Sequence, residues 1–234
     1  MSNLIILHGW QSSKEKWEKV KNVLQKQQQV IVPDLPGFKK ETRLKQIWDL
    51  DDFVKWFEKF SLNKGKFFLL GHSFGGRIAI KFAIKHPDKI KALILVDSAG
   101  IIPDIKHKKI TKFIIYAQKI SFLPFYNFFR KMFYKYILKT TDYVEAEKVP
   151  YLAETFKNVI AQDLTKYFSE IKVPVFIVWG DKDKLTPVSD AYIMNKKIKN
   201  SKIQIFKNIG HSPHIEIPKI LATKIQKYIY GIKN

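Results

Sequence analysis

The stretch that decides the fold is Lys66-Phe67-Phe68-Leu69-Leu70, followed directly by Gly71-His72-Ser73-Phe74-Gly75-Gly76. The first five residues form a short and nearly continuous apolar run, which predicts a strand buried on both faces. The residues after Ser73 predict a helix to about Lys85, because His86-Pro87 ends the pattern. A G-x-S-x-G between a strand and a helix indicates a sharp turn that exposes a reactive serine.

Outward from this stretch, short apolar runs alternate with segments of helical spacing. Helices are predicted over residues 13–27 and 47–60. Alternating strands and helices imply right-handed parallel crossovers, so the sequence predicts an α/β fold with one doubly wound sheet of six strands. The other five predicted strands are residues 3–7, 30–32, 91–96, 173–179 and 203–206.

An insertion over residues 101–170 separates the fourth predicted strand from the fifth and has no strand pattern. Ile110, Phe113, Ile114 and Ala117 follow helical spacing, and residues 123–138 predict a second helix. The segment holds 15 of the 33 aromatic residues. Two interpretations stay open: a lid that closes on an apolar ligand, or small helices that need bulky side chains for their own core. We therefore expect a core of residues 1–100 and 171–234 with a helical cap of residues 101–170.

Composition excludes several classes of protein. The 234 residues include 42 Lys+Arg and 21 Asp+Glu, a net charge of +21, and no cysteine. Disulfides, thiolate metal sites and a cysteine nucleophile are therefore excluded, and a cytoplasmic location is expected. Only Arg43, Arg77 and Arg130 are arginines, and the lysines are scattered, so no nucleic-acid partner is predicted. Since no apolar run reaches about 18 residues and no leader follows Met1, no membrane span and no signal peptide are expected.

Ser73 is the candidate nucleophile. Its hydroxyl must project above the sheet on a strained turn, and Gly71, Gly75 and Gly76 let the neighbouring backbone pass closely. The helix that starts after Ser73 also directs its N-terminal dipole toward charge that develops there.

A serine hydroxyl needs a histidine that removes its proton. His211 is the best candidate, because it lies in the loop after the last predicted strand, where the carboxyl ends of the strands converge. The other histidines have structural interpretations: His8 and His72 shape loops at strand ends, His86 and His107 lie on the surface of a helix end and the cap, and His214 lies on the surface or lines the site.

The histidine in turn needs a carboxylate that orients it. Asp183 is favoured because it can reach across to the His211 loop, whereas Asp181 lies directly at the strand end and is expected to brace the loop. Asp97, after the fourth predicted strand, is a third option that also fits a loop-bracing role. Asp34, in Pro33-Asp34-Leu35-Pro36-Gly37, is expected to be a turn residue.

The oxyanion of a tetrahedral intermediate needs fixed hydrogen-bond donors, and backbone amides suffice. The amide of Phe74 directly follows the nucleophile. The loop His8-Gly9-Trp10, after the first predicted strand, offers the Trp10 amide as the second donor.

Five motifs in order give the chain a close resemblance to the α/β-hydrolase superfamily, especially its small lidded serine carboxylesterases and carbon–carbon bond hydrolases. The resemblance implies the same catalytic Ser73, Asp183 and His211, the same oxyanion hole of Trp10 and Phe74, a lid after the fourth strand here, and no cofactor. The family usually has a leading antiparallel hairpin, which this sequence lacks. The motifs are His8-Gly9-Trp10, Asp34-Leu35-Pro36-Gly37, Gly71-His72-Ser73-Phe74-Gly75-Gly76, Trp179-Gly180-Asp181-Lys182-Asp183 with Pro187, and Gly210-His211 with Glu216 and Pro218.

The sequence therefore predicts a serine hydrolase that cleaves carboxylic esters, and lactones among them, through an acyl-enzyme on Ser73. The expected partner is a small ester with an apolar or aromatic acyl part. Two alternatives stay open. One is a carbon–carbon bond hydrolase with the same triad, for which Arg130 is the only arginine of the cap that can hold a substrate carboxylate. The other is a ligand receptor of low turnover on the same fold.

Overall fold

The computed structural model describes residues 3–102 and 149–233 and contains one sheet of six strands in the order β2-β1-β3-β4-β5-β6. Every pair of neighbouring strands is parallel. The predicted fold class is confirmed. The strands are β1 (Asn3–Leu7), β2 (Gln29–Ile31), β3 (Phe67–His72), β4 (Ile90–Val96), β5 (Val175–Gly180) and β6 (Ser201–Phe206).

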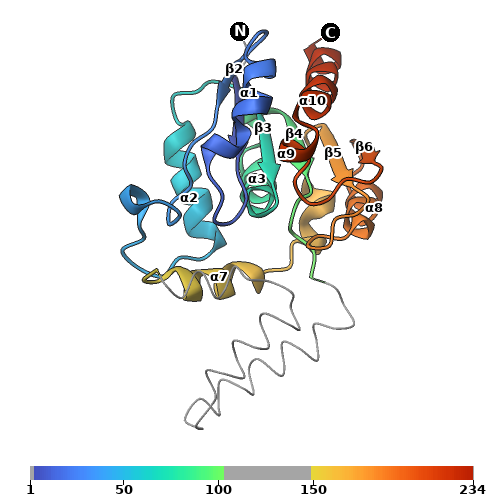
Figure 1. The fold of residues 1–234 in the computed structure, drawn as a ribbon. Coiled ribbons are helices and arrows are strands. Elements are labelled where there is room, and N and C mark those ends of the chain that lie inside the picture. The colour runs from blue at the N-terminus through green and yellow to red at the C-terminus, as the bar shows by residue number, and fades with distance from the viewer. Residues whose placement is uncertain (1–2, 103–148, 234) are drawn as a thin grey trace.

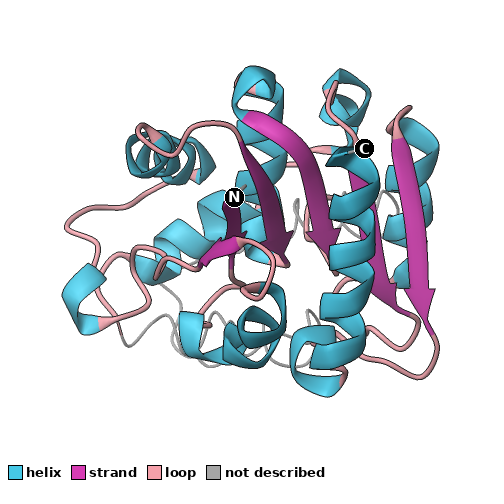
Figure 2. Cartoon of the chain, turned by 90° about the horizontal axis from the view of Figure 1, so that it is seen from above, coloured by secondary structure: helices cyan, strands magenta, loops and turns pink. Residues whose placement is uncertain are grey.

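Helices cover both faces of this sheet (Figure 2). The α-helices are α1 (Glu18–Leu24), α2 (Leu50–Ser61), α3 (Phe74–Lys85), α7 (Leu152–Ile160), α8 (Val188–Lys197), α9 (Pro213–Glu216) and α10 (Pro218–Lys233). Short 3-10 helices complete the described chain: η1 (Lys14–Trp17), η2 (Lys40–Thr42), η3 (Pro87–Lys89) and η5 (Thr165–Glu170).

Alternation along the strands divides the core into two layers. Along β3, Phe67 and Leu69 pack into the layer formed with α2, α3 and α8, whereas Phe68 and Leu70 pack into the layer formed with α1 and α10. All six residues of β3 are buried, so the strand reads as a continuous apolar run rather than an alternating one.

Two predicted helices have different bounds in the structure. The helix expected from residue 47 begins at Leu50, because the Asp49 side chain accepts a hydrogen bond from the amide of Asp52 and caps the helix there. The segment expected as one helix over residues 13–27 divides into η1 and α1. Its first turn is 3-10, with the amide of Lys16 donating to the carbonyl of Ser13, and Gln27 donates to Leu24 in another tight turn.

Strand order places a crevice at the carboxyl edge of the sheet. The chain passes from β1 to β2 on one side and from β3 to β4 on the other, so the connections that follow β1 and β3 lead to opposite sides of the sheet. Helix α7 runs along this carboxyl edge, and both ends of the chain lie at the opposite edge (Figure 1). Within the predicted cap, residues 103–148 lie outside the described residues, and the described part of that segment contains the helices α7 and η5 joined by short loops.

Candidate active site

Ser73 stands at the sharp turn between β3 and α3, as its motif predicts. It is the N-cap of α3 and adopts φ 51° and ψ −119°, a conformation that costs a non-glycine residue about 1–3 kcal/mol. The surrounding backbone holds it there: the Ser73 amide donates to the Val96 carbonyl, and the Ser73 carbonyl accepts from the amides of Gly76 and Ala99. The turn is therefore fixed by main-chain contacts from β4 and the loop after it.

Two glycines make this turn sterically possible. A Cβ on Gly71 would lie 2.6 Å from the Gly75 carbonyl oxygen and from the Gly76 Cα, and a Cβ on Gly75 would overlap the carbonyl of Leu7 on β1. The first residues of α3 thus pack directly against the end of β1, which brings Ser73 to the crevice between β1 and β3.

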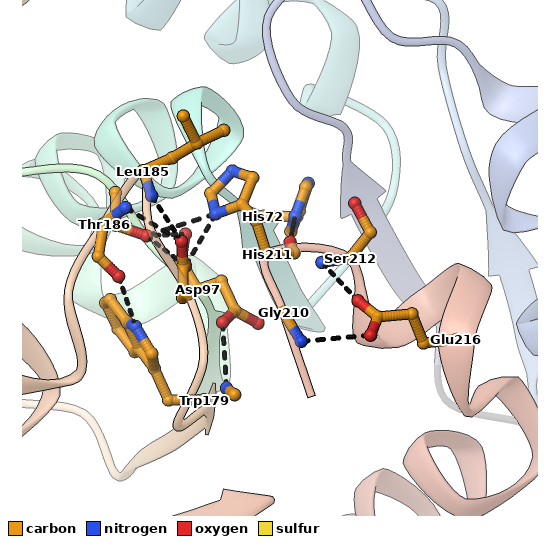
Figure 3. Close-up of polar contacts among 11 residues, drawn as sticks. His72, Asp97, Trp179, Leu185, Thr186, Gly210, His211, Ser212 and Glu216 are labelled. Atoms are coloured by element: carbon orange, nitrogen blue, oxygen red, sulfur yellow. Dashed lines mark hydrogen bonds and ion pairs between the residues drawn. The ribbon is translucent and has the colours of Figure 1, made fainter. Parts of the chain in front are cut away.

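Asp183 and His211 form a buried pair on the loops after β5 and β6. The Nδ1–H of His211 donates to Asp183 Oδ2 over 2.7 Å, and the Asp183 side chain is fully buried. The same carboxylate accepts from the Thr186 hydroxyl at 2.7 Å and from the amides of Leu185 and Thr186 at 2.8 and 3.0 Å (Figure 3). Burial opposes ionisation of Asp183, but the hydrogen bonds from His211 and Thr186 outweigh it and hold its pKa below the usual value.

The backbone on each side of His211 is held by charged and polar side chains. Glu216 accepts hydrogen bonds from the amides of Gly210 at 3.0 Å and Ser212 at 3.2 Å (Figure 3). His72 Nε2–H donates to the carbonyl of His211 itself at 2.9 Å. These contacts fix the main chain, while the Asp183 bond fixes the ring, so the free Nε2 of His211 has a defined direction.

A cavity of about 420 Å³ brings the two halves together, since Ser73 and His211 both line it. Among the contacts of the described residues, no hydrogen bond joins the Ser73 hydroxyl to His211, and such bonds often tighten only when substrate is present. Trp10 and Phe74 line the same cavity. Helix α7 and the His211 side contribute much of its apolar lining, with Phe156, Val159, Ile160, Leu185 and Ile215.

The two residues whose amides are the expected oxyanion donors, Trp10 and Phe74, lie next to each other in the cavity wall. Phe74 is the first residue of α3, so its N–H has no intrahelical acceptor and faces the N-terminal end of the helix. Trp10 follows β1, and its ring packs edge-on against the Phe74 ring at 5.1 Å between centroids. The loops after β1 and β3 thus lie in contact at the serine.

Comparison with known proteins agrees with this geometry. The model of a protein family described as the alpha/beta hydrolase fold matches residues 3–218. The chain belongs to the α/β-hydrolase family. Among curated proteins, it is 27% identical over 257 residues to the monoacylglycerol lipase ABHD6 of Mus musculus, covering 99% of this chain and 76% of that protein.

A second relative has nearly the same length. The pimeloyl-[acyl-carrier protein] methyl ester esterase of Legionella pneumophila (strain Lens) is 27% identical over 239 residues, covering 97% of this chain and 94% of that protein. Among solved structures, a membrane phospholipase A described as a bacterial virulence factor superposes with a TM-score of 0.78 at 23% identity, covering 100% and 80% of the two chains. A thermophilic esterase from Thermogutta terrifontis superposes with a TM-score of 0.74 at 19% identity, covering 100% and 91%. These two likenesses show the fold.

In this α/β hydrolase, the third candidate acid is part of the same cluster. Asp97, Asp183 and His211 offer ligand atoms within 4.8 Å of one another, the one such group among the described residues. Asp97 is fully buried, has φ 42°, and its Oδ1 accepts from the Gly180 amide at 3.0 Å. Burial and the neighbouring Asp183 carboxylate raise the pKa of Asp97 to about 9. Asp97 is therefore a neutral acid at pH 7, whereas Asp183 is ionised and bonded to the histidine.

The remaining acids have the roles that the sequence suggests. The Asp181 carboxylate accepts from the amide of Asn208 at 2.7 Å and so braces the loop between β6 and His211. Asp34, in the turn after β2, pairs with Lys14 and Lys39 at 3.0 Å each. Neither residue contacts the Asp183–His211 pair.

The other histidines divide into two groups. As predicted, His8 shapes a loop, because its Nε2 accepts from the amide of Leu35 at 3.0 Å, and His86 lies at the end of α3, where it contacts Glu58. His214 lines the cavity, as one of its two interpretations held, but it is not a surface residue. Its ring stacks on Trp17 at 4.4 Å, and burial lowers its pKa to about 3. His107 lies outside the described residues.

Two polar residues of the site have no sequence signal that points to them. Thr186 donates to Asp183, and its hydroxyl lies 3.3 Å from His211 Nδ1. Arg77, four residues after Ser73, is 6% exposed and lines the cavity. A threonine before a proline reads as a loop residue and an arginine on a helix reads as a solvated side chain, so only the tertiary structure shows where they lie.

Proposed function

We propose that the protein is a serine hydrolase that cleaves carboxylic esters through an acyl-enzyme on Ser73. One observation carries the proposal: a serine held at φ 51° at the N-terminus of α3 shares a cavity with a histidine whose Nδ1–H is bonded to a buried carboxylate. The two curated relatives described above are named as a lipase and an esterase, which supports hydrolysis of esters by this fold.

In the proposed mechanism, His211 acts in both half-reactions. Its Nε2 takes the Ser73 proton as the oxygen attacks the ester carbonyl, and then gives that proton to the departing alcohol. A water molecule next loses a proton to the same Nε2 and attacks the acyl carbon, after which Ser73 regains its proton. Asp183 holds the Nδ1–H tautomer and stabilises the imidazolium that forms in each step.

The amides of Trp10 and Phe74 form the proposed oxyanion hole. The first four amides of a helix have no intrahelical acceptor, and the dipole of α3 adds positive potential at Phe74. Loss of one such donor typically costs about 2.7–4 kcal/mol of barrier. Because both proposed donors are backbone groups, side-chain substitution at Trp10 leaves the donor in place and changes the cavity wall instead.

The proposed substrate has an acyl part that is apolar over much of its length. Trp10, Phe74 and Phe156 line the cavity beside the serine, and Leu185 and Ile215 stand exposed at its rim. We further propose that residues 101–170 are the cap of this site, which residues 1–100 and 171–234 carry. No described helix has the length and apolarity that a bilayer crossing requires.

The proposal is tested by hydrolysis of 4-nitrophenyl esters from acetyl to dodecanoyl. We expect turnover by the wild type and loss of at least about 10³-fold in kcat for Ser73→Ala, because the nucleophile is removed. Ser169→Ala, at an exposed position of η5, is the matched control and should keep full activity. A fluorophosphonate should add its mass to the wild type once, on the peptide that contains Ser73.

Other outcomes point to the alternatives. Turnover of a vinylogous diketone in the absence of ester turnover would favour the carbon–carbon bond hydrolase, whose Arg130 lies outside the described residues. Thermal stabilisation by an ester without product would favour a receptor. Ester turnover that survives in Ser73→Ala would contradict the acyl-enzyme.

A further inference from the structure

Arg77 is a buried cation in the wall of the cavity. It lies four residues after Ser73 on α3, about one helical turn, and only 6% of it is exposed. No carboxylate of the described chain lies within ion-pair distance of it, and Asp163 and Asp190 act on it only through space. Desolvation lowers the pKa of this guanidinium to about 10, so it remains charged at neutral pH. A buried charge without a partner is costly, and such a group needs an anion or a set of acceptors.

The protein supplies acceptors for only part of this guanidinium. Its Nη1 donates to the carbonyls of Val159 at 3.3 Å and Gln162 at 2.6 Å, which lie at the C-terminal end of α7. Arg77 has five N–H donors in a planar fork, and these two bonds use Nη1 alone. Within the described part of the chain, Nε and Nη2 have no acceptor, and neither is among the fully buried polar atoms that lack a partner. Arg77 is one of the residues that line the cavity.

The rest of the wall favours an anion as well. None of the described residues that line the cavity is an aspartate or a glutamate, and Lys16 and Lys184 stand exposed at its rim. These two exposed lysines are weak evidence for an anionic ligand, because lysine is abundant throughout this chain and exposed charges are screened by salt. The buried arginine is different, because low dielectric strengthens its attraction and its fork matches a carboxylate.

The apolar wall leads to this cation. Val159, whose carbonyl accepts from Arg77, also lines the cavity, as do Phe156 and Ile160 of the same cap segment. Ser73, these apolar residues of α7 and Arg77 thus line one cavity, and the guanidinium is bonded to the backbone at the end of α7.

From this arrangement we propose that Arg77 binds a carboxylate at the far end of the substrate acyl chain, so that the preferred substrates are half esters of dicarboxylic acids. This inference rests on the proposed ester hydrolysis at Ser73. In this binding mode the substrate carboxylate accepts from Nε and Nη2, while Nη1 keeps its bonds to α7. Arg77 is then the residue that selects an acidic acyl group over a neutral one.

The test compares two matched 4-nitrophenyl esters: the half ester of suberic acid and the same ester with its free carboxyl converted to a carboxamide. The pair has equal length and shape and differs in charge. We expect the wild type to favour the acid by at least about tenfold in kcat/KM, and Arg77→Met to bring the ratio near one. Arg43→Met removes the same charge from an exposed position and should leave the ratio unchanged.

A purely structural role of Arg77 predicts something else. If the side chain only ties α7 to the core, Arg77→Met lowers turnover of both esters equally and the ratio stays at its wild-type value, which would overturn the proposal. A wild type without preference would overturn it too. If Arg77→Met does not fold, competitive inhibition of the wild type decides: suberate should inhibit at least about tenfold better than suberamide. Absence of turnover of both suberic esters and of the neutral 4-nitrophenyl esters would instead refute the ester hydrolase itself.

Discussion

The two halves of the site are held in place by different physics. On the nucleophile side, Ser73 is positioned by backbone packing: glycines without a Cβ, a positive φ and main-chain hydrogen bonds from β4. On the acid–base side, His211 is positioned by side chains, since Asp183 accepts four hydrogen bonds and Glu216 accepts two. One half thus depends on sterics and the other on ionisation.

This difference predicts how each half fails. The Ser73 half, which is positioned by backbone packing, should fail all at once, because an added methyl group either fits or displaces a strand. A hydrogen-bonded site weakens in steps and responds to pH, because each carboxylate can gain a proton. The following substitutions test that contrast.

Gly75→Ala should have the largest effect. The new Cβ would overlap the Leu7 carbonyl, and because that atom belongs to β1 it cannot yield without moving the strand. We expect loss of all measurable turnover and a fall in the free energy of unfolding of at least about 3 kcal/mol, measured by urea denaturation. Gly231→Ala is the control: a methyl group added there on α10 would have no atom within 4 Å, and the substitution should be neutral or stabilise the helix by up to about 1 kcal/mol. Equal behaviour of the two variants would refute the steric half of the comparison.

Asp183→Asn should cost activity while leaving the fold intact. An amide in place of the carboxylate keeps the shape but no longer fixes the Nδ1–H tautomer or stabilises the imidazolium, so we expect kcat to fall by about 10³–10⁴-fold. The far-ultraviolet circular dichroism spectrum should not change. Asp181→Asn is the matched control, because an asparagine oxygen can still accept from the Asn208 amide, and it should keep kcat within about threefold. Similar losses in both variants would show that Asp183 only braces its loop.

Asp97→Asn should have the smallest effect on turnover and a clear effect on the pH dependence of stability. The folded protein keeps the Asp97 proton up to a pH of about 9, whereas the unfolded chain loses it near the ordinary aspartate pKa of 3.8. Between these values the unfolded state binds fewer protons, so this residue makes the free energy of unfolding fall as pH rises. Asparagine removes that contribution. The free energy of unfolding of the variant should therefore rise relative to that of the wild type by up to about 1.4 kcal/mol per pH unit between about pH 5 and 8.

Urea denaturation at several pH values measures this difference. The exposed Asp88→Asn is the control, and its difference from the wild type should not change over the same range. If the difference in free energy of unfolding between Asp97→Asn and the wild type does not change with pH, Asp97 is ionised in the folded protein. That result would contradict the prediction.

The sequence predicts the steric half better than the polar half. A glycine pattern between an apolar run and a helical pattern is local, so the turn at Ser73 is visible in the sequence itself. The sheet is visible for the same reason, and its strands differ from their predicted bounds mainly by one or two residues at the ends. The pairing of His211 with Asp183 follows from the expected topology, and the structure places the two side chains in contact.

What the sequence leaves open depends on contacts between distant segments. The burial of His214 requires η1 to bring Trp17 onto its ring. The raised pKa of Asp97 comes from burial within the fold and from Asp183, which belongs to a loop more than about 80 residues away. The Arg77 environment requires the end of α7. None of these partners is near in sequence, so neither periodicity nor composition signals them.

The placement of the chain ends has a practical consequence. Because β1 starts and α10 ends at the edge of the sheet opposite α7, a peptide tag or surface anchor fused to either end projects away from the cavity (Figure 1). Immobilised protein therefore presents the carboxyl edge of the sheet, where the cavity lies, to the bulk liquid. Binding of suberate and suberamide can then be measured on a sensor chip with the protein attached by its N-terminus or by its C-terminus. Equal affinities in the two orientations would indicate that the signal comes from the cavity.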